Sequence, residues 1–214
     1  LHRLIRRQRQ MCIRDRQGTL YSLQELKDIH DVCRKYDMYL FVDGARLGYG
    51  LGSEKNDVAL EDLSALTDVF YFGGTKCGAL FGEAVVITAD ALKKRFKAYM
   101  KQNGAVLAKG WLLGLQFHCL LEHDLYFTAT RRADALAMKL REAFTEQGIP
   151  FWVESFTNQQ FVILSDAQKG TLEKRYIFEP MGKSADGGNI ARFCTSWATT
   201  EEEVQTLIDD LRTL

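Results

Sequence analysis

Several signals that define whole classes of protein are missing from this 214-residue sequence. The longest uncharged runs, such as residues 110–121, are far shorter than the ~20 apolar residues that a membrane-spanning helix needs. No secretory signal is visible at the N-terminus, and the five cysteines are odd in number and never spaced as Cys-x-x-Cys. This pattern favours free thiols in a reducing compartment over a disulfide framework, so we expect a cytoplasmic protein.

The sequence also lacks an excess of either charge, with 28 basic and 28 acidic side chains. Residues 1–16 contain six of the basic side chains and one of the acidic ones, which leaves 22 basic and 27 acidic side chains after them. A mildly acidic body argues against nucleic-acid binding. Residues 1–16 have no helical or strand period and crowd like charges together, which predicts a disordered or non-native lead-in rather than a nucleic-acid-binding arm.

Apolar periodicity from residue 17 onward predicts the alternating strands and helices of an α/β protein. Ser22 and Glu25 form a capping-box pair ahead of a helix expected to reach Tyr36, and four glycines between residues 44 and 52 predict a loop. We expect residues 17–125 to belong to a large domain built on parallel strands and residues 126–214 to form a small α+β domain. Further helices are predicted over 60–66, 89–102, 105–122, 128–146 and 200–211, and strands over 39–42, 70–72, 84–88, 151–156, 160–164 and 190–195.

Two of the predicted strands end beside residues that are suited to chemistry. The apolar run 39–42 stops at Asp43, and the run 70–72 is followed by Gly73, Gly74, Thr75 and Lys76. In open α/β sheets, ligands bind at the carboxyl edge where parallel strands end. The separation of 33 residues between Asp43 and Lys76 suits one strand–crossover–strand unit, so both side chains are expected to face one pocket.

A carboxylate and an amine at one sheet edge match a pyridoxal phosphate site, in which a lysine binds the cofactor covalently and an aspartate pairs with the pyridinium nitrogen. The glycines around Lys76 let a flat ring approach, and a partly desolvated lysine has more free amine available as a nucleophile. Two alternatives stay open, because Lys76 can be a solvent-facing loop lysine and Asp43 can accept hydrogen bonds from the turn at Gly44. A nucleotide-binding P-loop is not indicated, since Gly-x-x-x-x-Gly-Lys-Ser/Thr is absent.

Two arginines are candidates for binding an anionic substrate. Arg46 follows Asp43 by three residues, and Arg192 lies in the predicted strand 190–195. Arginine pairs bidentately with carboxylates, so either residue can hold the α-carboxylate of an amino acid, although each alone is also compatible with a surface salt bridge. The four histidines are expected to be structural or exposed, because none has the spacing of a metal site.

Three motifs follow one another along the sequence. They are Asp43-Gly44-Ala45-Arg46-Leu47-Gly48, then Gly73-Gly74-Thr75-Lys76 followed by Gly78-Ala79, and then Arg192 with Thr195-Ser196-Trp197. Together they resemble the low-specificity L-threonine aldolase family, within the aromatic amino acid β-eliminating lyase/threonine aldolase group of fold-type I pyridoxal phosphate enzymes. The resemblance covers the chain from about Gln17 to the C-terminus, and residues 18–22 also match it.

This resemblance implies a part of the fold-type I large domain, mostly a parallel sheet with helices, followed by a small α+β C-terminal domain. It implies that Lys76 carries pyridoxal 5'-phosphate with Gly74 and Thr75 beside it, and that Asp43 contacts the ring nitrogen. Arg46 and Arg192 would then bind the substrate carboxylate. No metal is implied.

The activity implied by the resemblance is cleavage of the Cα–Cβ bond of β-hydroxy-α-amino acids, with threonine or allo-threonine giving glycine and acetaldehyde. A homodimer or homotetramer is implied as well. Two departures stand out: Cys77 occupies a position where many relatives have asparagine, and the N-terminal half of the family is missing. We therefore expect a partial chain. The alternatives are a β-eliminating lyase or an aminotransferase on the same fold, or a catalytically inert fragment or subunit.

Overall fold

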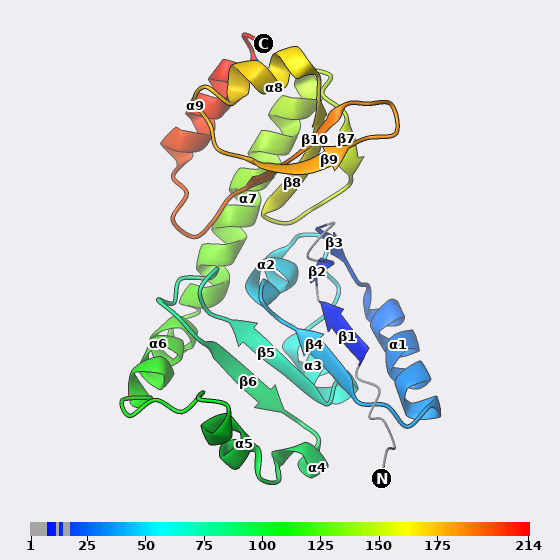
Figure 1. Ribbon diagram of the computed structural model, residues 1–214, viewed down its shortest axis with the longest axis vertical. Helices are drawn as coiled ribbons and strands as arrows, with labels where there is room; N and C mark the ends of the chain where they lie inside the picture. Colours follow the sequence, from blue (N-terminus) through cyan, green and yellow to red (C-terminus); the bar gives the residue numbers. More distant parts are fainter. Residues whose placement is uncertain (1–7, 12, 15–17) are drawn as a thin grey trace.

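Helix α7 (Leu125–Glu146) runs from one half of the molecule into the other and contributes to both hydrophobic cores (Figure 1). The structure, a computed structural model, describes residues 8–11, 13–14 and 18–214. The first core collects buried side chains from residues 26 to 133, and the second collects those from residues 136 to 211. We propose that the two cores mark two domains, with α7 shared by both.

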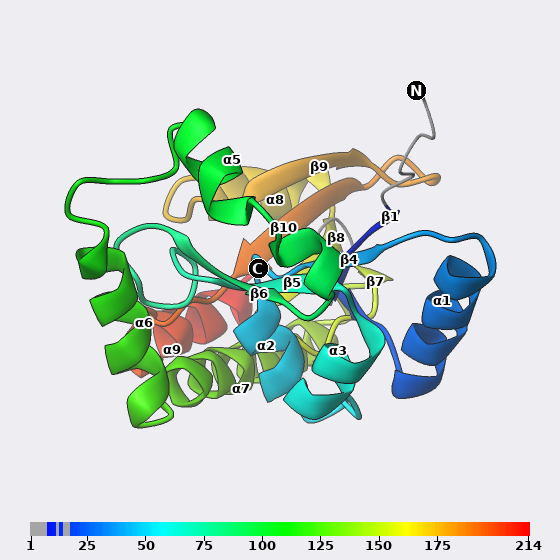
Figure 2. The same ribbon diagram turned by 90° about the horizontal axis from the view of Figure 1, so that it is seen from below.

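The first half is built on a four-stranded sheet of order β1-β4-β5-β6. The first three strands in this order are parallel to one another, and β6 is antiparallel to β5. Figure 2 shows α2 (Leu47–Gly52), α3 (Leu60–Leu66) and α7 on one side of this sheet. The strands are β1 (Gln8–Met11), β4 (Leu40–Asp43), β5 (Val69–Gly73) and β6 (Glu83–Ile87).

The second half is an antiparallel sheet of order β7-β8-β10-β9 with helices packed on it. Its core includes Phe144 of α7, whose ring centroid lies 5.1 Å from that of Phe193. The elements are β7 (Phe151–Val153), β8 (Gln159–Leu164), α8 (Asp166–Leu172), β9 (Glu179–Lys183), β10 (Asn189–Cys194) and α9 (Glu201–Leu211).

Capping boxes mark the starts of two of the predicted helices. Helix α1 (Leu23–Lys35) begins after Ser22, whose hydroxyl accepts from the N–H of Glu25. Helix α9 begins in the same way after Thr200, with Glu203 as its partner. Helix α3 covers the predicted residues, so local signals were sufficient to predict these three elements.

The region after β6 is more broken than predicted. The expected helix over 89–102 is divided into α4 (Asp90–Lys93) and α5 (Phe96–Gln102), because Arg95 takes a left-handed conformation with φ of 63°. The next helix, α6 (Trp111–Glu122), starts six residues later than the sequence pattern predicted.

The predicted loop between residues 44 and 52 is wrong, because residues 47–52 form α2. Its glycines allow a close helix contact instead of flexibility. A Cβ added to Gly48 would lie 2.7 Å from the ring of Tyr126 and 2.8 Å from a methyl group of Thr130, both on α7. Glycine at this position therefore lets α2 pack directly against α7.

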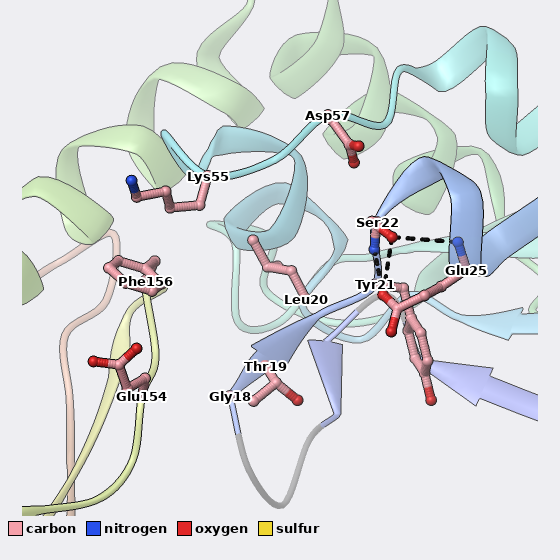
Figure 3. A pocket seen from close by; sticks show the side chains of 10 residues that line it. All are labelled: Gly18, Thr19, Leu20, Tyr21, Ser22, Glu25, Lys55, Asp57, Glu154 and Phe156. Carbon is pink, nitrogen blue, oxygen red and sulfur yellow. Dashed lines mark hydrogen bonds between the residues drawn. The ribbon is translucent and has the colours of Figure 1, made fainter.

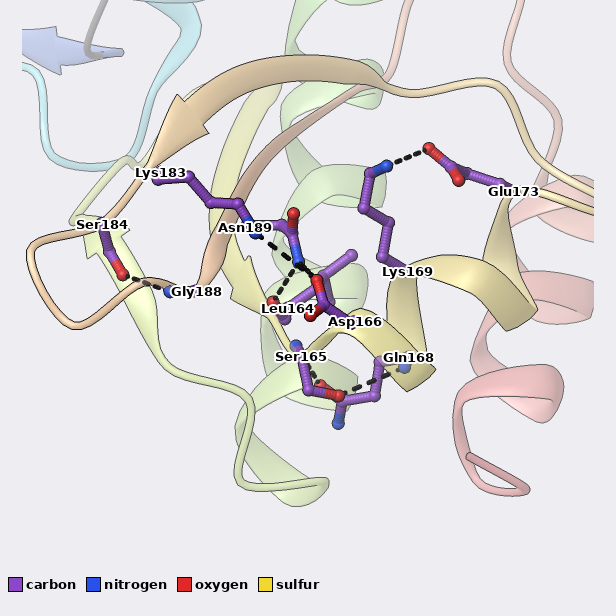
Figure 4. Close-up of polar contacts among 10 residues, drawn as sticks. All are labelled: Leu164, Ser165, Asp166, Gln168, Lys169, Glu173, Lys183, Ser184, Gly188 and Asn189. Atoms are coloured by element: carbon purple, nitrogen blue, oxygen red, sulfur yellow. Dashed lines mark hydrogen bonds and ion pairs between the residues drawn. The ribbon is translucent and has the colours of Figure 1, made fainter.

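Two elements of the second half were missed in the sequence, α8 and the edge strand β9. Helix α8 starts with a capping box, in which Ser165 accepts from the N–H of Gln168 at 3.2 Å. Figure 4 shows that the side-chain amide of Asn189 also donates to Asp166 at 2.8 Å, which connects the start of α8 to β10.

Part of the predicted lead-in is described. Residues 8–11 pair with β4, and β2 (Ile13–Arg14) pairs with β3 (Thr19–Leu20). The remaining residues of 1–16 lie outside the described part of the chain, so the prediction for the whole segment stays a prediction. No helix in the described residues is long and apolar enough to cross a membrane.

Candidate functional site

The ends of β4 and β5 lie side by side, because the two strands are parallel neighbours. β4 ends at Asp43, and β5 ends at Gly73, three residues before Lys76. The N–H of Gly73 donates to the carbonyl of Gly44 at 2.9 Å, so the pairing continues past the end of β4. A Cβ added to Gly44 would lie 1.6 Å from the carbonyl oxygen of Tyr71, so only glycine fits there. The sheet thus brings the segments that carry Asp43 and Lys76 to one edge.

The carboxylate of Asp43 is held in one orientation by two donors. The hydroxyl of Tyr71 donates to its Oδ1 atom, and the N–H of Ala45 donates to the same atom at 3.2 Å. Asp43 therefore does accept one hydrogen bond from the turn at Gly44, as the alternative interpretation of this residue predicts. Both of these contacts are made to Oδ1, and together they fix the orientation of the carboxylate.

The side chain of Lys76 is exposed, yet the protein around it disfavours the charged form. Partial burial is the main reason why the pKa of Lys76 is lowered, and the positive charge of Arg46 adds to this effect. Asp43 and Glu83 act in the opposite direction, because a nearby carboxylate stabilises the ammonium ion. Lys76 therefore presents more free amine at a given pH than a fully solvated lysine does, and Asp43 is near enough to act on it.

Arg46 lies in the same neighbourhood. It immediately precedes α2, and burial is the main cause of its lowered pKa. The positive charge of Arg192 lowers the pKa of Arg46 further, so the two guanidinium groups approach the same region from the two halves of the molecule. Two cations that face one space are suited to binding an anion between them.

Arg192 is engaged within β10 and its neighbouring strands. One of its terminal nitrogens donates to Oε1 of Gln159 at 3.0 Å, and the other forms an ion pair with Glu179, its direct partner on β9. The Glu179 side chain is 56% exposed, against 16% for Arg192. Arg192 therefore forms the salt bridge that the alternative interpretation predicts. A substrate carboxylate would compete with Glu179 for the Arg192 guanidinium.

Comparison with known proteins shows which family this chain resembles. The family model for beta-eliminating lyases matches residues 13–167. The chain belongs to this family. A low specificity L-threonine aldolase of Pseudomonas aeruginosa is 30% identical over 200 residues, which cover 91% of this chain and 56% of the relative.

Solved structures agree with this placement in the beta-eliminating lyase family. A structure of Leishmania major threonine aldolase is 41% identical, with a TM-score of 0.89 over 92% of this chain and 57% of the other. A transaminase from the marine bacterium Virgibacillus shares the fold at 15% identity, with a TM-score of 0.61 over 96% of this chain and 51% of the other. The predicted fold-type I class is confirmed, and the chain spans just over half the length of these relatives.

The side chain of Cys77 is fully buried directly after the exposed Lys76. Burial raises the pKa of the Cys77 thiol to about 11, so the thiol stays protonated and unreactive near neutral pH. Cys77 is therefore a packing residue under the lysine turn.

Glu83 is a site residue that the sequence analysis missed. Its Oε2 accepts from the N–H of Gly74 at 3.1 Å, and its charge acts on both Lys76 and Asp43. Burial is the main cause of its raised pKa. The sequence does contain a signal for Glu83, because it is an acidic residue at the first position of the apolar strand that follows the lysine loop.

These residues fit pyridoxal phosphate by the chemistry of their donors. Lys76 offers an amine with a lowered pKa, and Asp43 offers a carboxylate oriented by Tyr71. Thr75 is exposed beside Lys76, and Gly74 is held by Glu83. An amine and a carboxylate at one sheet edge are together suited to the aldehyde and the ring nitrogen of this cofactor.

A separate cavity of about 350 Å³ lies away from these residues, near the start of α1 (Figure 3). Its polar lining is already engaged within the protein: Asp57 accepts from the N–H of Leu23 at 2.8 Å, and Lys55 lies 5.5 Å from the ring centroid of Phe156. None of the predicted site residues lines it. Among the residues that the structure describes, no cluster of three His, Cys, Asp or Glu side chains is placed to bind a metal.

Proposed function

We propose that this chain is part of a pyridoxal phosphate-dependent lyase that cleaves the Cα–Cβ bond of β-hydroxy-α-amino acids. Threonine or allo-threonine would give glycine and acetaldehyde. The observation that carries the proposal is the convergence of Asp43 and Lys76 at one sheet edge, in a chain of the beta-eliminating lyase family. The names of two similar relatives support the aldolase reaction within that family.

Lys76 and Asp43 would hold the two ends of the cofactor ring. Lys76 supplies the amine for covalent attachment, and its lowered pKa keeps more of that amine uncharged. Asp43, oriented by Tyr71, would hold a proton on the ring nitrogen, and Gly74 and Thr75 would line the approach to the ring. When bound, the cofactor withdraws electron density from the substrate α-carbon, which makes cleavage of its bonds possible.

Arg46 and Arg192 would bind the substrate carboxylate. They come from different halves of the chain, and each influences the charge of Lys76. A carboxylate fixed between them sets the orientation of the bonds at the α-carbon relative to the lysine. That orientation decides which bond is broken.

The test is a product assay on the full-length holoenzyme, with threonine as the substrate. We expect release of glycine and acetaldehyde in equal amounts. The family name also favours elimination as the second candidate, and that reaction would release ammonia and an α-keto acid instead. Ammonia release without glycine would replace the aldolase proposal with the elimination reaction.

We also propose that the protein forms a homodimer or homotetramer and is cytoplasmic. The support for assembly is an apolar patch, formed by Leu80, Phe81, Trp111, Leu112 and Leu115. The N–H of Leu80 donates to Gln116 of α6 at 2.7 Å, so the two parts of the patch are adjacent. Leu80 is 86% exposed and Trp111 is 65% exposed, which is unusual for a free surface.

A double substitution tests the patch. In the full-length protein, Trp111→Glu with Leu115→Glu is expected to shift the mass measured by light scattering to that of a smaller species, because two charges would be buried in the interface. Ile177→Glu, at a fully exposed apolar residue outside the patch, is the control and should leave the mass unchanged. An unchanged mass for the double variant would contradict this assignment.

A further inference from the structure

Two buried tyrosines donate hydrogen bonds to the turn that carries Lys76. The hydroxyl of Tyr49 donates to the carbonyl of Lys76, and the hydroxyl of Tyr126 donates to the carbonyl of Gly73 at 3.0 Å. Both side chains are fully buried. The two carbonyls lie at either end of the same short segment, so the segment is held at both ends.

The turn needs this support because of its glycines. Gly74 and Gly78 flank Lys76, and Gly78 has φ of 111°, a conformation that glycine adopts easily. Within the turn, the N–H groups of Cys77 and Ala79 both donate to the carbonyl of Gly74, at 2.9 and 3.0 Å. These local bonds leave the carbonyl of Lys76 to be fixed by Tyr49.

Tyr49 is also connected to Arg46 through the backbone of α2. The N–H of Tyr49 donates to the carbonyl of Arg46 at 3.1 Å, within the first turn of α2. Burial raises the pKa of Tyr49, so its phenol stays protonated and can donate to the Lys76 carbonyl. Tyr49 thus connects the turn that carries Lys76 to the first turn of α2, which Arg46 precedes.

We propose that Tyr49 is a positioning residue that fixes the spacing between the Lys76 amine and the Arg46 guanidinium. This inference rests on the proposed function, because it assigns a purpose to that spacing. Without the hydroxyl, the Lys76 carbonyl loses its partner on α2, and the lysine turn is free to shift relative to Arg46. Displacements of about 1 Å in a catalytic group can cost about a hundredfold in rate.

The test compares Tyr49→Phe with Tyr176→Phe in the full-length holoenzyme. Tyr176 also loses a hydroxyl hydrogen bond, to Asp210, but it lies in the second half away from the site. For Tyr49→Phe, assayed at a temperature where the variant is fully folded, we expect kcat for threonine to fall by about tenfold or more and KM to rise. We also expect slower attachment of pyridoxal phosphate to Lys76, measured by borohydride trapping and peptide mass spectrometry across a pH series.

The outcomes separate this inference from the proposed function. If the wild-type protein does not attach the cofactor at Lys76, the proposed function is wrong. If it does, and Tyr49→Phe has the kinetics and pH profile of Tyr176→Phe, the inference about Tyr49 is wrong while the function stands. Should Tyr49→Phe fail to fold, 4-aminophenylalanine at position 49 keeps an N–H donor to the Lys76 carbonyl. Near-normal kinetics in that variant support the inference, and a tenfold loss in the folded protein contradicts it.

Discussion

Lys76→Ala in the full-length protein is expected to abolish covalent attachment of pyridoxal phosphate and to lower turnover of threonine by about a thousandfold or more. The reason is that Lys76 is placed at the edge where Asp43 ends the neighbouring strand, with its pKa lowered by burial and by Arg46. Attachment is read from the visible absorbance of the bound cofactor and from the mass of the trapped peptide.

Lys139→Ala is the control for this experiment. Lys139 is a half-exposed lysine of α7 that pairs with Glu201 at 3.5 Å, far from the lysine turn in sequence and outside the site. It should retain both attachment and turnover. Persistence of the cofactor absorbance in Lys76→Ala, with the modified peptide elsewhere, would show that another lysine carries the cofactor.

The second large effect concerns Asp134, a buried acid on α7. Its residue exposure is 4%, and neither carboxylate oxygen has a hydrogen-bond partner of good geometry among the described residues. Burial raises the pKa of Asp134 to about 9, and the nearby backbone N–H of Asn158 offsets this only in part. The charge of Asp134 would in turn raise the pKa of the nearby Tyr49, whose phenol stays neutral.

This raised pKa gives the stability a definite pH dependence. In the unfolded chain Asp134 ionises near its reference value of 3.8, whereas in the folded protein it stays protonated until about pH 9. The unfolded state therefore gains from ionisation as the pH rises from 4 to 9, and folding loses about 1.4 kcal/mol per pH unit in that range. At pH 7 the accumulated cost is about 4 kcal/mol.

Asp134→Asn removes this titration and keeps the shape of the side chain. We expect its free energy of unfolding to equal that of the wild type near pH 4 and to exceed it by about 4 kcal/mol at pH 7. Asp186→Asn, at an exposed position, is the control and should show little difference at either pH. A stabilisation by Asp134→Asn that does not change with pH would contradict the assignment of a protonated Asp134.

The placement of Asp43 and Lys76 could be predicted because their strands carry strong local signals. Each is a short apolar run ending at glycine, and parallel neighbouring strands bring the residues after their C-terminal ends to the same edge of the sheet. The helix starts at Ser22 and Thr200 were equally local, since a capping box involves residues three apart. Such features need no knowledge of the rest of the fold.

The missed features depend mostly on contacts between distant segments. The glycines of α2 predict a loop when read alone, and only the ring of Tyr126 shows why Gly48 must be glycine in a helix. Strand β9 has few apolar residues and exists because it pairs with β10, where Glu179 meets Arg192. Helix α8 is the exception, because Ser165 and Gln168 form a capping box that is visible in the sequence.

The roles of Tyr49 and Tyr126 could not be predicted from the sequence either. Each is an aromatic residue in an apolar setting, a pattern typical of core packing. Only the structure shows that both hydroxyls donate to carbonyls of the segment from Gly73 to Lys76. A buried tyrosine needs a partner for its hydroxyl, and here the partners are the site backbone itself.

The most direct test of this account is a crystal structure of the full-length protein with pyridoxal phosphate bound. We predict a covalent bond from Nζ of Lys76 to the cofactor and the carboxylate of Asp43 within about 3 Å of the ring nitrogen. A ring bound elsewhere, or one whose nitrogen faces away from Asp43 while Lys76 stays unmodified, would contradict the central claim that these two residues hold one cofactor between them.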